Sequence, residues 1–133
     1  MTNIREEIGT KVLDRGTEYD ALGRVKKETY PSGYYTVNTY DNDYGFLTEV
    51  KDKYGRQLWK AIQENARGQL TEVQRGGKTT TFGFDSKGLP TSIQSSGIVN
   101  MTYLFDNDGN LNYRTDNLTN QKEMFAYDGM NRL

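Results

Sequence analysis

The aspartates that follow an aromatic residue are the side chains in this sequence whose type and spacing could do chemistry. Two carboxylates held about 5 to 10 Å apart across a cleft are the machinery of glycoside hydrolysis. Here the aromatic–Asp pairs recur along the chain, and no pair differs from its repeat. Asp in such a pattern already has a turn-forming role, and a periodic motif is best explained by a periodic structure. We therefore interpret these carboxylates as structural and predict no catalytic residue.

Two short segments look like ion-binding or phosphate-binding loops, but neither has the full pattern. Residues 106–110 begin like an EF-hand loop, yet Gly109 is fourth instead of sixth and Asn117 stands where a bidentate Glu is required. Residues 76–80 end like a phosphate loop, but Glu72 occupies the place of its first Gly. The sequence has no His and no Cys, which removes the commonest general base, metal ligand and thiol nucleophile. We predict no metal, no cofactor and no enzyme activity.

Aromatic residues outside the Asp pattern offer a second kind of site, because sugars bind flat aromatic faces flanked by amides and carboxylates. The alternative is ordinary cross-strand packing, which aromatic residues on sheets do routinely. We favour packing and keep a ligand platform for carbohydrate as the alternative. The platform candidates are Tyr34, Tyr35, Tyr54, Trp59 and Tyr113.

A seven-residue motif recurs along the chain: an aromatic residue, Asp, two residues, Gly, one residue and an aliphatic residue. Its anchors stand at positions 20, 41, 65, 85, 106 and 128, which are 21, 24, 20, 21 and 22 residues apart. Looser copies add a residue before the Gly, replace Asp by Asn, or replace Gly by Asn. The motif residues are Tyr19, Asp20, Gly23 and Arg24; Tyr40, Asp41 and Gly45; Asn65 and Gly68; Phe84, Asp85 and Gly88; Phe105, Asp106 and Gly109; and Tyr127, Asp128 and Arg132.

A unit of this length fits a β-hairpin with two short turns. Asp at the first position of a type I turn accepts the backbone N–H two residues on, and Gly at the fourth takes positive φ at little cost. Between the turns the residues alternate as they do in strands. The sequence thus predicts an all-β fold, an antiparallel meander of tandem β-hairpin repeats that forms a curved strip or partial barrel. Second turns are expected halfway between the anchors, at residues 31–33, 52–55, 75–78, 95–97 and 116–120.

The beginning of the chain leaves two readings open. The four-residue spacing of Ile4, Ile8 and Val12 fits a short capped helix, and it equally fits a strand that leads into the first motif. We divide the chain into an N-terminal lead-in segment, 1–16, which is a strand or short helix, and the tandem repeats, 17–133, which are truncated at the C-terminus.

The motif resembles the Rhs, or YD, repeats of bacterial Rhs proteins, wall-associated proteins, insecticidal toxin complexes and animal teneurins. Residues 19–25 are close to the core Tyr-Asp-x-x-Gly-Arg-Leu of that family, residues 127–133 keep its Tyr, Asp, Arg and Leu, and the resemblance covers about residues 10–133. It implies a long β-sheet strip that spirals into a hollow shell around a C-terminal toxic polypeptide, or that presents surfaces outside the cell. The family's terminal core motif, Asp-Pro-x-x-Gly-Arg, does not occur in this chain, so the resemblance implies an internal fragment of the array.

The charge and hydropathy of the sequence argue against two classes of partner, nucleic acid and membrane. With 17 basic and 18 acidic side chains the net charge is -1, which gives no long-range field to attract nucleic acid, and no apolar stretch is suited to membrane insertion. We expect a non-catalytic structural and interaction scaffold from a larger exported or cell-surface protein, one that in this family can encapsulate a toxin. Its expected partners are the rest of the parent chain's repeat array and, through exposed strand edges, a second copy. A glycan is the partner under the alternative, a carbohydrate-binding or adhesive module.

Overall fold

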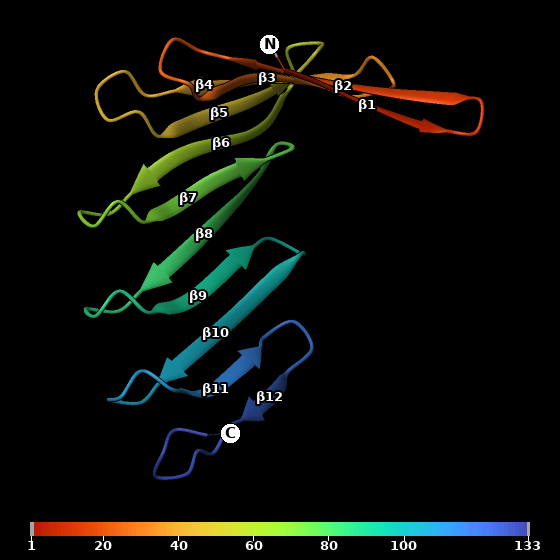
Figure 1. The fold of residues 1–133 in the computed structure, drawn as a ribbon. Coiled ribbons are helices and arrows are strands. Elements are labelled where there is room, and N and C mark those ends of the chain that lie inside the picture. Colours follow the sequence, from red (N-terminus) through yellow and green to blue (C-terminus); the bar gives the residue numbers. More distant parts are fainter. Residues whose placement is uncertain (1, 133) are drawn as a thin grey trace. The chain divides into compact units, whose positions relative to one another are not determined.

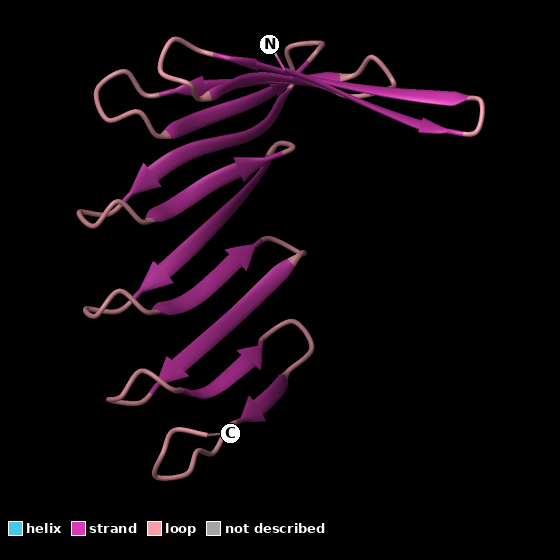
Figure 2. Cartoon of the chain, in the orientation of Figure 1, coloured by secondary structure: helices cyan, strands magenta, loops and turns pink. Residues whose placement is uncertain are grey.

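The structure is a computed structural model that describes residues 2–132, which form strands and turns (Figures 1 and 2). Twelve strands follow one another as an antiparallel meander whose strand order is that of the sequence, so the predicted fold class is confirmed. The ends of the predicted segments at residues 1 and 133 lie outside the described residues. The strands are β1 (Thr2–Ile8), β2 (Lys11–Tyr19), β3 (Val25–Thr29), β4 (Tyr35–Tyr40), β5 (Leu47–Asp52), β6 (Gln57–Glu64), β7 (Leu70–Arg75), β8 (Lys78–Phe84), β9 (Pro90–Ser95), β10 (Val99–Phe105), β11 (Leu111–Asp116) and β12 (Gln121–Met124).

The lead-in segment is a hairpin, and the helix alternative for it is wrong. Ile4 and Ile8 lie in β1 and Val12 lies in β2, which pairs with β1 along its whole length. Gly9 has φ +63° at the connection, a conformation that reverses the chain and would interrupt a helix. Strand β2 runs on to Tyr19, so the boundary drawn at residue 16 falls inside a strand.

Two compact units make up the chain, and each is described by itself. The first comprises residues 2–61 and 75–77, and the second comprises residues 62–74 and 78–132. In the first unit, each strand from β1 to β5 pairs antiparallel with the next. In the second unit, the strands from β8 to β12 pair in the same manner. No helix long and apolar enough to span a membrane occurs within residues 2–132.

A β-bulge recurs at the aromatic residue that precedes the motif Asp. The strand register shifts between Glu18 and Tyr19, and residue 26 on the following strand is left without a paired partner. A bulge raises the local twist and re-aims the side chains beside it. Each of these motif turns is therefore entered through the same irregularity. The equivalent shifts occur at Tyr40, Phe84 and Phe105.

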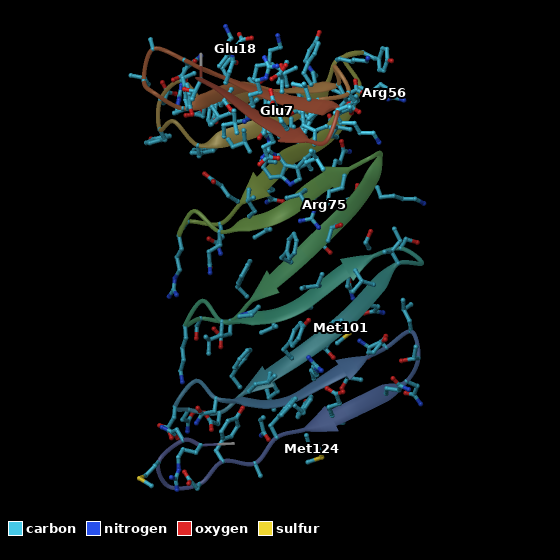
Figure 3. The ribbon with its side chains drawn as sticks, turned by 45° about the vertical axis from the view of Figure 1, so that its right-hand side comes forward. Glu7, Glu18, Arg56, Arg75, Met101 and Met124 are labelled. Carbon is cyan, nitrogen blue, oxygen red and sulfur yellow. The ribbon has the colours of Figure 1, made fainter. Side chains whose placement is uncertain are left out.

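One face of the second unit carries a row of large apolar side chains. Cross-strand partners share a face, and Phe82 lies opposite Ile93, which lies opposite Met101. Tyr103 and Phe105 follow Met101 at two-residue intervals, so they lie on that face too (Met101 is labelled in Figure 3).

Few side chains in the two units are fully buried. Among residues 2–132, Val73 is the buried hydrophobic residue, at 1% exposure, and the buried polar residues are Asp52, Thr80 and Ser95. Hydrogen bonds in the strand ladder and in the turns must therefore carry much of the specificity that a closed core supplies in other domains. Asp52 is only 2% exposed, and a carboxylate buried to that degree needs strong partners.

Candidate functional site

The turn at Asp20 is closed by one carboxylate that binds both the backbone and an arginine. Oδ1 of Asp20 accepts hydrogen bonds from the amides of Leu22 and Arg24, both at 2.9 Å, and Oδ2 accepts one from Nε of Arg24 at 2.7 Å. The amide of Gly23 donates to the carbonyl of Asp20, and the amide of Asp20 donates to the carbonyl of Arg24. Gly23 has φ +79°, which explains why Gly is favoured at this position. We call this arrangement the Asp clamp.

The Asp clamp recurs with four kinds of closing residue. It is repeated with arginine at Asp52–Arg56 and at Asp128–Arg132, where Nε lies 2.7 Å from Oδ2 in both cases. Asn65 builds a neutral copy, because its Oδ1 accepts from the amides of residues 67 and 69 and its Nδ2 donates to Oε1 of Gln69. In the turns that begin at Asp85 and Asp106, the carboxylate accepts the same two amides, while Leu89 and Asn110 stand at the closing position.

The turn at Asp41 is the looser copy that the sequence predicts. Oδ1 of Asp41 accepts from the amides of Asp43 and Tyr44, and the amide of Asp41 donates to the carbonyl of Phe46, one residue later than in the Asp clamp. Gly45 has φ +79°. The turn thus accommodates the added residue, and β4 and β5 still pair as a hairpin.

Hydrogen bonds hold the pKa of five turn carboxyl groups below its ordinary value. For Asp52, burial is the largest single effect and would raise the pKa, but hydrogen bonds from the amide and guanidinium of Arg56 and the amide of Tyr54 together outweigh it. The pKa of Asp106 is lowered chiefly by the amide of Asn110, and that of Asp128 by the guanidinium of Arg132. These groups are ionised at neutral pH, which is unsuited to a general acid. The pKa is likewise lowered at Asp20 and Asp116.

Successive motif turns are joined by hydrogen bonds from one turn to the next. In the first unit, Nη1 of Arg24 donates to the carbonyl of Gly45 at 3.2 Å. In the second unit, Gln69 donates to the carbonyl of Gly88 at 3.0 Å, and Lys87 donates to the carbonyl of Asn107 at 2.9 Å. These donors stand two or four positions after the anchor of their motif. The contact between turns is therefore a repeating feature of the motif. Arg67 also donates to the carbonyl of Ser86, and Asn110 to Oδ1 of Asn131. We call these contacts the turn ladder; Figure 1 shows the turns after β8 and β10 at the same end of their strands.

Arg24 shows why the motif pairs arginine with tyrosine. Besides Asp20 and Gly45, its guanidinium lies over the ring of Tyr40, 4.3 Å from the centroid. Tyr40 in turn donates its hydroxyl to the carbonyl of Val25 at 2.8 Å. One side chain thus binds its own Asp, the aromatic residue of the next motif and the Gly of the next turn.

Replacing Arg24 by Ala is expected to lower the Tm by roughly 4–8 °C, because three contacts are lost together. Arg24→Lys should recover only part of the loss, since an ammonium cannot donate to Asp20 and Gly45 while stacking flat on Tyr40. Thermal denaturation followed by circular dichroism measures both changes. Lys26→Ala, an exposed neighbour in β3, is the matched control and should change the Tm little. An Arg24→Ala variant as stable as Lys26→Ala would contradict the triple role.

Within the first unit, the platform candidates do not share one face. Thr36 and Asn38 share a face with Asp52, Val50 and Trp59 by strand register, whereas Tyr35 points to the opposite face of the same sheet. Tyr34 precedes β4, with its ring 6.3 Å from that of Tyr30. Tyr54 is 68% exposed in the Asp52 turn, and Tyr113 belongs to the second unit.

Cations of the same chain cover part of several of these rings. Nζ of Lys27 lies 4.6 Å from the centroid of Tyr35, and Nζ of Lys122 lies 3.7 Å from that of Tyr113. The guanidinium of Arg56 lies 5.2 Å from the ring of Tyr54. Each of these rings therefore offers a sugar less free surface than its exposure alone indicates.

The most strongly built clamp, Asp52–Arg56, was interpreted from the sequence only as a halfway turn. The structure gives it every bond of the Asp20 turn, with the side chain of Asp52 fully buried and Arg56 at 2.7 Å. The signal was present, because residues 52–56 read Asp-x-x-Gly-Arg. Because these residues stand halfway between two anchors, the period of the motif assigns them to the opposite end of the hairpin. Within residues 2–132, no group of three acidic side chains is placed to hold a metal ion.

No family model matches the chain, and no curated protein matches it in sequence. Solved structures match it in fold. A TcdB2–TccC3–Cdc42 complex gives a TM-score of 0.79 at 16% identity, over 94% of this chain and 7% of that chain. A Photorhabdus luminescens Tc holotoxin pore with a mutated TccC3 gives 0.75 at 19% identity, over 92% of this chain and 7% of that chain. TcdB2–TccC3 without its hypervariable C-terminal region gives 0.71 at 18% identity, over 82% and 6%. The likeness shows a shared fold, and the chain spans only a small part of the length of those chains.

Proposed function

We propose that the chain is a non-catalytic structural scaffold, a segment of Rhs- or YD-repeat β-sheet from a larger exported or cell-surface protein of the kind that encloses a toxin. The observation that carries the proposal is the turn ladder, in which the conspicuous polar side chains bind their own turn and the next one. A carboxylate that accepts two amides and a guanidinium has little capacity left for a substrate. The polar side chains of the turns therefore hold successive repeats together.

The structural neighbours support the same proposal. They include a TcdB2–TccC3–Cdc42 complex and a Tc holotoxin pore, and this chain matches each over more than nine tenths of its own length within a much longer chain. A segment that corresponds to 7% of such a chain is suited to be part of a wall, with cargo or surface function supplied by other segments.

Sequencing the gene on both sides of this segment tests the proposal. We expect further motifs at spacings of about 20–24 residues, leading to an Asp-Pro-x-x-Gly-Arg core and then an unrelated C-terminal domain. Flanks that contain no further motif would overturn the scaffold proposal. An export signal or surface anchor within a few repeats would replace toxin enclosure by adhesion as the finer function.

The carbohydrate-binding alternative has its own test, which uses the purified chain. Saturable binding to a glycan array that is lost in Trp59→Ala or Tyr113→Ala would favour it. We expect no such binding, because the candidate rings lie on different faces or beside cations of the chain. Arg5→Ala, far from these rings in sequence, is the control for nonspecific loss.

A further inference from the structure

An Asp-Gly pair places a side-chain carboxyl beside a backbone nitrogen that no Cβ of the following residue shields. Such a pair occurs twice in the chain, at residues 108–109 and 128–129, and both lie in motif turns of the second unit. The first is in the turn between β10 and β11 (Figure 1), and the second follows β12. Both aspartates are exposed, but their hydrogen bonds differ.

The carboxylate of Asp128 is held by its own turn. Oδ1 accepts hydrogen bonds from the amides of Met130 and Arg132 at 2.8 and 3.0 Å, and Oδ2 accepts one from Nε of Arg132 at 2.7 Å. The guanidinium of Arg132, followed by the two amides, holds the pKa of Asp128 below its ordinary value, so the carboxyl is ionised at neutral pH. An ionised carboxylate with both oxygens occupied is a poor electrophile.

The carboxylate of Asp108 has no such partners. The backbone amide of Asp108 donates to Oδ1 of Asp106 at 2.9 Å, but no hydrogen bond or ion pair within residues 2–132 engages the side-chain oxygens of Asp108. The side chain borders a polar hollow that Asn110 and Asn131 also line, so water reaches it. This carboxyl is therefore free to turn toward its own backbone.

The nitrogen of Gly109 is the group that the Asp108 carboxyl can meet. Its N–H donates to the carbonyl of Asp106 at 3.3 Å, whereas the corresponding bonds are 2.9 to 3.1 Å long at Gly23, Gly55, Gly68 and Gly88. A longer hydrogen bond is weaker and frees the nitrogen more readily. Gly109 has φ +86°, a conformation that requires glycine, so an Asp at position 108 always precedes a Gly. The residues before the other four glycines carry no carboxyl group: Leu22, Tyr54, Arg67 and Lys87.

We propose that Asp108–Gly109 is a site of spontaneous isoaspartate formation, and that the Asp clamp protects Asp128–Gly129 from the same reaction. The nitrogen of Gly109 loses its proton and attacks Cγ of Asp108; a C–N bond forms, and the carboxyl hydroxyl leaves as water. Water then opens the cyclic succinimide. When it adds to the original main-chain carbonyl, the old C–N bond breaks, and the chain thereafter runs through the former side chain of residue 108. Water is the only co-reactant, released in the first step and consumed in the second.

The product has one more backbone atom in the turn, which breaks the register of the clamp. The two amides that Oδ1 of Asp106 accepts lie on either side of the altered linkage. The same turn holds two contacts of the turn ladder, from Lys87 to the carbonyl of Asn107 and from Asn110 to Oδ1 of Asn131. Isoaspartate formation therefore loosens the attachment of this turn to both neighbouring motif turns.

Ageing of the purified full chain tests the proposal. Samples kept at neutral pH and physiological temperature are digested briefly with pepsin in the cold, and electron-transfer mass spectrometry locates isoaspartate in the peptides. Residue 108 should accumulate isoaspartate several-fold faster than residue 128. In concentrated urea, where no clamp forms, the two pairs should react at similar rates, which separates the effect of the fold from that of the local sequence.

Two variants separate the reacting carboxyl from the protecting clamp. Asp108→Lys copies the residue of the Asp85 turn and should abolish isoaspartate at this position while leaving residue 128 unchanged. Arg132→Ala removes the guanidinium from Asp128 and should raise isoaspartate at residue 128 several-fold, with residue 108 unchanged. Circular dichroism establishes that both variants keep their β-sheet.

In the aged wild type, the amide of Asn110 should lose its protection from hydrogen exchange in the same fraction of molecules that carry isoaspartate. Three results would overturn the proposal. They are a folded chain without isoaspartate at residue 108, equal rates at residues 108 and 128 of the folded chain, and an Arg132→Ala variant in which residue 128 reacts as slowly as in wild type.

Discussion

Replacing Asp52 by Ala is expected to lower the Tm of the chain by about 10 °C, the largest effect of any single motif substitution. The side chain of Asp52 is fully buried and binds the amides of Tyr54 and Arg56 and the guanidinium of Arg56. Its removal leaves the amides of Tyr54 and Arg56 without their side-chain acceptor, whereas the guanidinium of Arg56, whose side chain is 69% exposed, can still bind water. An unsatisfied buried donor costs more than a lost bond gains. Thermal denaturation at neutral pH measures the change.

Another turn of the chain provides the template for a variant that should rescue this substitution. Asn65 and Gln69 build the same turn without charge, with Nδ2 of Asn65 3.0 Å from Oε1 of Gln69. Asp52→Asn combined with Arg56→Gln should therefore recover at least half of the Tm lost in Asp52→Ala, whereas Asp52→Asn alone leaves Arg56 facing a neutral amide and should recover less. If Asp52→Ala were as stable as wild type, or if the double variant were no better than Ala, the clamp would not be a structural unit.

Acidification is expected to unfold the chain below about pH 4, and this is the second large effect. The pKa of five clamp or turn carboxyls is lower in the folded chain than its ordinary value of 3.8, chiefly because turn amides and arginines bind the ionised form. For a lowered folded pKa, the stabilising contribution is fully present above the unfolded pKa and is lost as the pH falls through the folded pKa. The Tm should therefore be flat from about pH 5 to 8, helped by the absence of His, and should fall as the pH drops below the ordinary Asp value.

Thermal denaturation across this pH range provides the measurement, and the Asp52→Asn, Arg56→Gln double variant provides the control. The Tm of this variant should depend less on pH in acid than that of wild type, because one titrating carboxylate has been replaced by an amide. A Tm that already falls between pH 7 and 5 would mean that a carboxyl has a raised folded pKa, contrary to the clamp geometry.

Turn chemistry made most of the fold predictable from the sequence. Asp followed by Gly three residues later specifies a turn through local bonds, and the expected bond from the amide two residues on forms at Asp20, Asp85 and Asp106. The halfway turns follow from the same logic, with the amide of Gly33 donating to Tyr30 and that of Ile98 donating to Ser95.

The face on which a side chain lies was harder to predict. Period-two alternation assumes an unbroken ladder, and a bulge adds one residue and changes the count. The register between β5 and β6 shifts between Val50 and Lys51, which determines that Trp59 lies on the face of Val50. Tyr35 and Trp59 could not be assigned to opposite faces without that register. The sequence alone therefore could not show whether the aromatic side chains of the proposed platform share a face.

The hydrogen bonds between successive turns could not be predicted from the sequence either. Arg24 and Gly45 are 21 residues apart, and their hydrogen bond exists only because successive hairpins place their turns side by side. The four-residue spacing of Ile4 and Ile8 fits a helix and a strand face alike, and only the positive φ of Gly9 and the pairing with β2 decide between them.

Amide hydrogen exchange, read residue by residue by NMR, tests the central claim that the turns beginning at residues 20, 52, 65, 85, 106 and 128 are the same structural clamp. The account predicts slow exchange for the closing amide of each turn, because the side-chain oxygen of the anchor accepts it: residues 24, 56, 69, 89, 110 and 132. Protection should therefore recur with the period of the motif and should fall in acid at the turns of Asp20, Asp52, Asp106 and Asp128, while the Asn65 turn is spared. A motif turn whose closing amide exchanges freely while the others are protected would contradict the account, because its carboxylate would then be free to bind something other than its own backbone.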